Sequence, residues 1–134
     1  AAGAVILAAD TVVACGRRVL PKAEDEKTAR ACLALLSGRR HRVLGGVAVR
    51  DAKGVVRVRV AETAVAFKRL TTAEIDAYIA SGEWRGKAGG YAIQGLAAAS
   101  IHWIQGSYSN VVGLPLFETA TMLRAAGVGS GGRT

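Results

Sequence analysis

The sequence predicts a protein of the α/β class (α+β mixed), in which helices flank a mixed, partly antiparallel sheet. Segments with apolar residues at helical spacing are interspersed with segments whose apolar residues are continuous or alternate, as strands require. Asp and Gly at residues 51–54 mark a turn between two such strands, and no internal repeat is present. The chain has 134 residues, 51% of them hydrophobic, which is enough for one core. We therefore expect a single domain over residues 1–128 and a disordered tail over residues 129–134.

The first predicted strand covers residues 5–9, a continuous apolar run of the kind found in strands that are buried on both faces. It ends at Asp10 and Thr11, and two further short strands are expected over residues 12–20, around a turn at Gly16. Polar side chains at the end of a buried strand are natural candidates for a functional site.

The clearest helix is predicted over residues 23–36, because its apolar residues recur at i, i+3, i+4 and i+7. Two long antiparallel strands follow, over residues 43–49 and 55–67. In the second of these strands, Glu62 stands where the alternation of valines should continue. That position predicts either a bulge or a functional carboxylate.

The second half of the chain combines a short helix, a loop and a final helix. Thr71 and Glu74 form a capping box, which predicts the start of the short helix. Residues 83–90 hold three glycines, two cations and a tryptophan without periodicity, which is typical of a functional loop. Beyond that loop we expect strands over residues 101–104 and 108–112, and then a helix from Pro115 to Gly127.

The charge of the chain favours an anionic partner. The net charge is +8, and the densest basic run covers residues 39–42. That run contains no aromatic residue, and aromatic residues make up only 5% of the chain, which argues against stacking on nucleic-acid bases. A basic nucleic-acid-binding module nevertheless remains an alternative interpretation.

Cys15 and Cys32 are the only cysteines and form no C-x-x-C pair, so we expect two buried free thiols in a reducing compartment rather than a disulfide. The apolar run at residues 1–9 is too short to span a bilayer, which predicts a cytoplasmic protein with no membrane partner. The chain starts without methionine almost directly on a predicted strand, so it looks truncated at its N-terminus.

Six polar residues are candidates for a site, because each lies at a strand end, on a loop or within an apolar stretch. Triphosphate hydrolysis needs a carboxylate to hold hydrated Mg²⁺ or to activate water, and cations to neutralise phosphate charge. A glutamine amide can pair with a uracil or thymine ring. Turn-capping, solvated or surface roles for the same residues remain open. The candidates are Asp10, Thr11, Lys22, Glu62, Lys87 and Gln94.

Four segments occur in the order in which they are found in Maf proteins: residues 8–13 (AADTVV), 36–43 (LSGRRHRV), 86–95 (GKAGGYAIQG) and 106–116 (GSYSNVVGLPL). Over residues 5–127 the chain therefore resembles the Maf family of nucleoside triphosphate pyrophosphatases, also called septum formation proteins.

The resemblance implies a fold like that of inosine triphosphate pyrophosphatases, a divalent cation (Mg or Mn), and hydrolysis of a nucleoside triphosphate to the monophosphate and pyrophosphate. Asp10 would be the catalytic or metal-linked carboxylate, with Lys22 and Lys87 as catalytic cations. Thr11 would lie beside the substrate, and the Ile-Gln-Gly form around Gln94 looks like the branch acting on dTTP and UTP, with modified pyrimidine nucleotides also open. Glu62 is our further candidate for substrate binding. A homodimer is a family-level expectation.

One departure from the family pattern is large. The Ser-x-Ser-Pro-Arg-Arg motif that opens the family's sequences, and the Glu after it, are absent from these residues. Because those groups bind phosphate and help to hold metal, the resemblance implies that this chain by itself is inactive. A non-catalytic regulator of septum formation and cell division is the alternative that this departure motivates.

Overall fold

The computed structural model describes residues 3–128 and contains one five-stranded sheet in the order β2-β1-β3-β4-β5. The α/β class is confirmed. Every strand pairing in the described part of the chain is antiparallel, whereas the sequence predicts a mixed, partly antiparallel sheet. The strands are β1 (Ile6–Cys15), β2 (Arg18–Leu20), β3 (Arg40–Arg50), β4 (Val56–Phe67) and β5 (Ile101–Gln105). The helices are α1 (Glu26–Leu36), α2 (Thr72–Ser81), the 3₁₀ helix η1 (Leu96–Ser100), α3 (Tyr108–Val112) and α4 (Leu116–Ala125).

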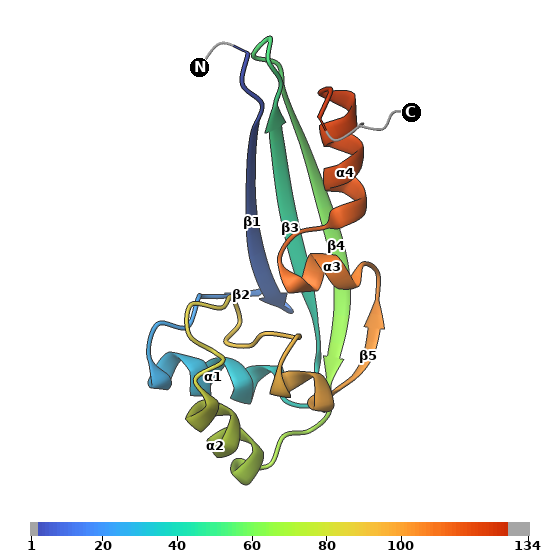
Figure 1. Ribbon diagram of the computed structural model, residues 1–134. Helices are drawn as coiled ribbons and strands as arrows, with labels where there is room; N and C mark the ends of the chain where they lie inside the picture. The colour runs from blue at the N-terminus through green and yellow to red at the C-terminus, as the bar shows by residue number, and fades with distance from the viewer. Residues whose placement is uncertain (1–2, 129–134) are drawn as a thin grey trace.

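The long strands β1, β3 and β4 form an extended ribbon, with α1 and α2 gathered at one end and α3 and α4 beside β4 (Figure 1). The main core lies at the helical end and includes Val13, Leu36, Val65 and Phe67. A smaller core around Met122 joins α4 to β3. Along β3 the buried side chains alternate with less buried ones, because successive residues of a strand point to opposite faces of the sheet.

The first strand differs from the prediction in two ways. β1 does not end at Asp10 and Thr11 but continues to Cys15, so both residues lie in its middle. Its first half is also exposed rather than buried, with Ile6 at 45% exposure. The reason is that β2 pairs only with the last three residues of β1, and α3 and α4 contact β3 and β4 instead.

The predicted hairpin is confirmed: Asp51 Oδ1 accepts hydrogen bonds from the backbone N–H groups of Lys53 and Val55, both at 2.9 Å. The predicted bulge at Glu62 is wrong, because Glu62 pairs with Leu44 in regular register. The valines that precede Glu62 on the same face of β4 are themselves exposed, so Glu62 interrupts no buried face. The sheet irregularity lies between Ala66 and Phe67.

The helix predicted over residues 23–36 begins at Glu26, with Asp25 as its N-cap. Ala23 is not helical because its N–H donates to the carbonyl of Lys87 at 3.0 Å, and its carbonyl accepts from Gly86 at 2.8 Å. The loop that follows the second helix therefore takes the backbone hydrogen bonds of Ala23 that a helix would need.

The strand predicted over residues 108–112 is wrong, because these residues form α3. The hydroxyl oxygen of Ser107 accepts a hydrogen bond from the backbone N–H of Asn110 at 3.2 Å and caps the helix. This local cap, with the packing of the helix on the sheet, overrides the strand propensity of valine and tyrosine. The final helix starts at Leu116 after Pro115 and reaches Ala125, two residues before the predicted Gly127.

Both cysteines are buried free thiols, as predicted. Within residues 3–128 no helix is both long and apolar enough to cross a membrane. The tail over residues 129–134, predicted to be disordered, lies outside the described residues.

The capping box of α2 is confirmed and gives a stability prediction. The Thr71 hydroxyl accepts from the Glu74 N–H at 3.1 Å, and the Glu74 carboxylate accepts from the Thr71 N–H at 2.8 Å. We expect Thr71→Ala to lower the free energy of unfolding by about 1 kcal/mol, measured by urea denaturation. The matched control is Thr72→Ala, one residue further on, where no cap is lost; equal destabilisation by both variants would contradict the capping role.

Candidate functional site

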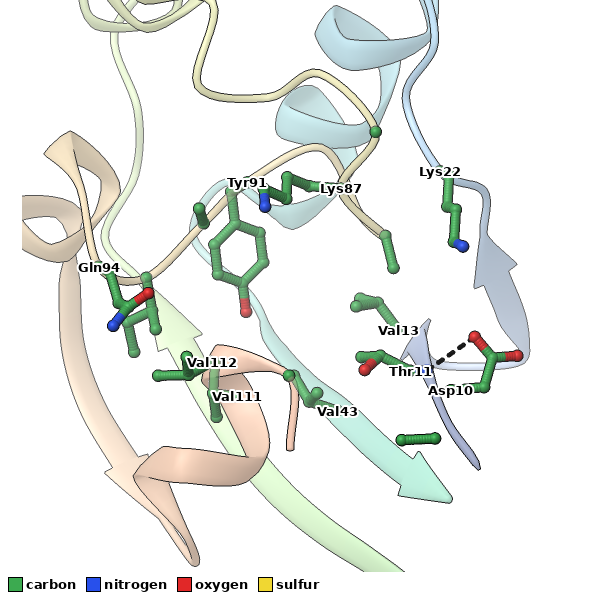
Figure 2. A pocket seen from close by; sticks show the side chains of 16 residues that line it. Asp10, Thr11, Val13, Lys22, Val43, Lys87, Tyr91, Gln94, Val111 and Val112 are labelled. Atoms are coloured by element: carbon green, nitrogen blue, oxygen red, sulfur yellow. Dashed lines mark hydrogen bonds between the residues drawn. The ribbon is translucent and has the colours of Figure 1, made fainter. Parts of the chain in front are cut away.

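A pocket of about 260 Å³ opens where β1, β3, α3 and the loop over residues 86–94 meet. Figure 2 shows Asp10, Thr11 and Lys22 on one side of this pocket, Gln94 with Val111 and Val112 on the other, and Lys87 and Tyr91 between them. Polar groups thus stand at both ends of the pocket, with Lys87 between them, and apolar side chains form much of the remaining wall.

Asp10 and Thr11 enter the pocket from the exposed part of β1. The Asp10 Oδ1 accepts a hydrogen bond from the backbone N–H of Thr11 at 2.9 Å, which orients the carboxylate. Among residues 3–128, Asp10 is the only acidic residue that lines the pocket. Its carboxylate forms no ion pair with any residue of the described range 3–128, so it is free to act on a ligand.

The two lysines are placed by paired backbones. Lys22 forms an antiparallel bridge with Ala88, and the carbonyl of Pro21 accepts a hydrogen bond from Gly89 at 3.0 Å. The backbone pairing of Ala23 with the same loop fixes Lys87 beside this bridge. Neither ammonium group forms an ion pair within residues 3–128. Two unneutralised cations on adjoining segments are suited to binding an anion with more than one charge.

The loop comes this close to the sheet because of its glycines. A Cβ on Gly89 would lie 2.9 Å from the Val13 side chain, and a Cβ on Gly90 would lie 3.2 Å from that of Cys32. Both glycines also have positive φ, at 73° and 77°, a conformation that side chains disfavour. The glycine-rich segment predicted as a functional loop is therefore a lining element of the pocket.

Tyr91 follows these glycines and forms part of the pocket wall. Its hydroxyl lies 2.6 Å from Nε2 of His41, a buried residue on β3. Phe67 completes a cluster of three rings, stacked on His41 and edge-on to Tyr91. Burial lowers the pKa of His41 to about 4 and raises the pKa of the Tyr91 phenol above its ordinary value. Both side chains are therefore neutral near pH 7.

The structure brings together five of the six residues that the sequence singled out, and Glu62 is the exception. Glu62 is exposed on β4 and is not among the pocket-lining residues. Its side chain follows the exposed valines Val58 and Val60 on the face of the sheet away from the core. Its role in substrate binding stays a prediction.

Sequence reasoning missed Tyr91 and the apolar wall formed by Val43, Val111 and Val112. Tyr91 could have been found, because an aromatic residue directly after a glycine-rich loop is carried to the same place as the loop. The apolar wall could not have been found from the sequence, because the sequence predicts a strand at Val111 and Val112, which lie in α3 instead.

The pocket offers a limited set of metal ligands. No group of three His, Cys, Asp or Glu side chains comes together as a metal site within residues 3–128. A single carboxylate does suit Mg²⁺, which usually keeps several waters and is held by one or two carboxylates together with substrate phosphates. Asp10 therefore fits a metal that arrives with a phosphorylated ligand, and the described residues do not form an all-protein cage.

A carboxylate and two lysines that form no ion pair within residues 3–128, together with a close-packed glycine loop, give this α/β fold a pocket suited to an anionic ligand. The family model described as Maf-like protein matches residues 1–126, and the chain belongs to the Maf family.

Three similar proteins are each named dTTP/UTP pyrophosphatase. The protein from Paramagnetospirillum magneticum is 67% identical over 125 residues, which cover 93% of this chain and 66% of the relative. The protein from Gluconobacter oxydans is 66% identical over 135 residues, covering 96% of this chain and 62% of the relative. The protein from Novosphingobium aromaticivorans is 62% identical, with 96% of this chain and 64% of the relative covered. The chain thus spans less than two thirds of the length of these relatives.

Proposed function

We propose that this protein is a nucleotide pyrophosphatase that hydrolyses dTTP or UTP to the nucleoside monophosphate and pyrophosphate. The observation that carries the proposal is the pocket itself, which is lined by one carboxylate, by two lysines that form no ion pair within residues 3–128, and by a glutamine on the side away from the carboxylate. The similarity to dTTP/UTP pyrophosphatases supports the same activity and the same bases.

In this proposal Asp10 accepts the proton of the attacking water. The water oxygen forms a bond to the α-phosphorus, the bond from that phosphorus to the bridging oxygen breaks, and pyrophosphate leaves. Lys22 and Lys87 neutralise the charge that develops on the phosphate oxygens. A divalent metal bound with the triphosphate, Mg²⁺ or Mn²⁺, would polarise those oxygens, and Asp10 is the pocket residue that would hold it.

The base is recognised at the other end of the pocket. Gln94 carries both an amide donor and a carbonyl acceptor, which match the adjacent carbonyl and N–H of uracil or thymine. Val111 and Val112 lie on the same side of the pocket and suit the flat face of a ring (Figure 2). Thr11, beside Asp10, is placed to contact the substrate near the phosphates. A cytoplasmic location and a homodimer remain predictions.

The alternative of a nucleic-acid-binding module gains no support from the basic run over residues 39–42. Arg39 and Arg42 donate to backbone carbonyls of the protein itself, and Arg40 stacks 4.3 Å from the centre of the Trp103 ring. A non-catalytic role in septum formation is distinguished by the assay below, because that role requires no turnover.

The test is pyrophosphate release from a panel of common and modified triphosphates with Mg²⁺ or Mn²⁺. It compares the 134-residue chain with a version that carries any flanking sequence its gene encodes. We expect turnover of dTTP and UTP by the longer version. Absence of pyrophosphate release from every triphosphate would sink the proposal and favour the non-catalytic role.

The base specificity is tested by Gln94→Glu. A carboxylate has no N–H to donate, so one of the two hydrogen bonds to the base is lost. We expect kcat/KM for dTTP and UTP to fall by about tenfold to a hundredfold, the cost of leaving a polar group of the base unpaired. Gln105→Glu, at an exposed glutamine of β5 outside the pocket, is the matched control and should change little. A Gln94→Glu variant as active as the control would remove Gln94 from base recognition.

A further inference from the structure

The hydrogen bond between His41 and Tyr91 leaves one polar atom without a partner. His41 is 2% exposed and Tyr91 is 6% exposed, and 2.6 Å separate Nε2 of the histidine from the phenol oxygen. The other ring nitrogen of His41, Nδ1, is buried and has no hydrogen-bond partner among the described residues. The direction of the bond to Tyr91 therefore decides what Nδ1 must be.

Two arrangements of the protons are open to a neutral imidazole. If the Tyr91 hydroxyl donates to Nε2, the ring proton sits on Nδ1 and a buried N–H is left unpaired. If Nε2–H donates to the Tyr91 oxygen, Nδ1 carries only an unpaired lone pair. Orphaned buried N–H groups are rarer in proteins than acceptors that lack a partner. The second arrangement leaves no orphaned N–H, and the hydroxyl hydrogen of Tyr91, which lines the pocket, can pair there with water or a ligand. We favour the second arrangement on this ground.

The Tyr91 hydroxyl faces the pocket. Tyr91 lines the pocket, and Figure 2 shows its hydroxyl pointing toward Val43 and Val111. These neighbours offer only apolar side chains, so the phenol is the polar group at this part of the wall. It lies between the side that carries Asp10 and the side that carries Gln94. A ligand that spans these two sides presents its middle to Tyr91.

We propose that Tyr91 is a substrate-contacting residue whose hydroxyl donates a hydrogen bond to an acceptor oxygen in the middle of the bound nucleotide. His41 is then a positioning residue that turns the hydroxyl toward the pocket. The ring stack with Phe67 holds the imidazole in place. This inference rests on the proposed function for its ligand. The tautomer of His41 can be tested without any ligand.

The first measurement is long-range ¹H–¹⁵N correlation NMR on the ¹⁵N-labelled protein near pH 7. We expect the His41 ring to be protonated at Nε2 and bare at Nδ1. A ring protonated at Nδ1 would overturn the proposal, because the Tyr91 hydroxyl would then donate its hydrogen to Nε2 of His41 and have none left for the nucleotide. A purely structural role for His41 makes no such demand on the tautomer.

The second measurement is binding of the α,β-imido analogue of dTTP, which is not hydrolysed, to the protein with any flanking sequence its gene encodes. We expect Tyr91→Phe to weaken binding about threefold to tenfold, as loss of one neutral hydrogen bond does. Tyr108→Phe is the matched control, because Tyr108 is exposed and outside the pocket. Equal binding by the wild type and Tyr91→Phe would overturn the inference.

A double-mutant cycle tests the link between the two residues. His41→Phe keeps a ring in the stack and removes the donor, so it should weaken binding in the wild-type background and add nothing in the Tyr91→Phe background. Additive losses would exclude the positioning role. If His41→Phe does not fold, the NMR measurement on the unmodified protein still decides the point. A wild type that binds and hydrolyses no nucleotide overturns the proposed function instead, which separates the two failures.

Discussion

Asp10→Asn is expected to lower kcat for pyrophosphate release by about a hundredfold to ten-thousandfold, the usual contribution of a positioned general base. An amide of the same shape can neither take up the proton of the attacking water nor contribute a negative charge to a metal. In the described part of the chain, no other acidic residue lines the pocket to replace it. The variant should be measured in the protein with any flanking sequence its gene encodes, with Mg²⁺ and dTTP.

The fold should survive this substitution. Asp10 is exposed, and the one hydrogen bond its carboxylate accepts within the described residues comes from the Thr11 N–H, which an asparagine Oδ1 can also accept. We therefore expect the urea midpoint of Asp10→Asn to match that of the wild type. Asp76→Asn is the control, because it removes the same charge from an exposed site on α2, where only a surface ion pair with Arg30 is lost. Full activity in Asp10→Asn would exclude Asp10 as the base.

Glu62→Gln belongs in the same series, because the predicted role of Glu62 in substrate binding is untested. A higher KM for dTTP with unchanged stability would support that role. Kinetic constants equal to those of the wild type would remove Glu62 from the candidate site and agree with its position outside the pocket.

Asn110→Asp is expected to destabilise the fold by about 3 kcal/mol or more. The fully buried Asn110 amide nitrogen donates to the Val43 carbonyl at 3.0 Å, and to the Ala61 carbonyl and Thr63 hydroxyl, both at 3.1 Å. An aspartate has no N–H to offer, so it leaves these acceptors unpaired and faces its own negative charge toward two carbonyl oxygens. Unpaired buried polar groups cost about 1–3 kcal/mol each, and buried charges cost more.

The side chain at position 110 has little space in which to move away from these acceptors. Its Oδ1 occupies the space where a Cβ on Gly45 would lie, so the side chain is held close against β3. The measurement is urea denaturation, with Asn110→Ala expected to fall between Asn110→Asp and the wild type. Tyr108→Ala, at an exposed position of the same short helix, should change the unfolding free energy by about 0.5 kcal/mol or less. A wild-type midpoint for Asn110→Asp would show that the amide contributes nothing to stability.

Local patterns in the sequence predict the elements whose causes are local. The helix α1 follows from its apolar spacing, α2 from its capping box and the β3–β4 hairpin from Asp51 and its turn. The order of family segments also predicts most of the site, because Asp10 and Gln94 lie within them. These features need no knowledge of how distant parts of the chain pack.

The errors arise where packing decides. Residues 108–112 have strand-forming side chains, and only the serine cap and the burial of Asn110 against β3 and β4 make them helical. The exposure of the first half of β1 depends on which strands and helices lie beside it. His41 and Tyr91 meet across 50 residues of sequence, so neither hydrophobic period nor spacing indicates that they form a pair.

The backbone bridge between Lys22 and Ala88 also bears on how tightly an anion can be held. Two cations on separate flexible loops would have to be drawn together by the ligand, and the lost conformational freedom would be subtracted from the binding free energy. Here the segments that carry Lys22 and Lys87 are hydrogen-bonded to each other, so that freedom is already lost when the chain folds. The distance between the two lysine backbones is then a property of the fold, and only the lysine side chains need to be ordered when an anion binds.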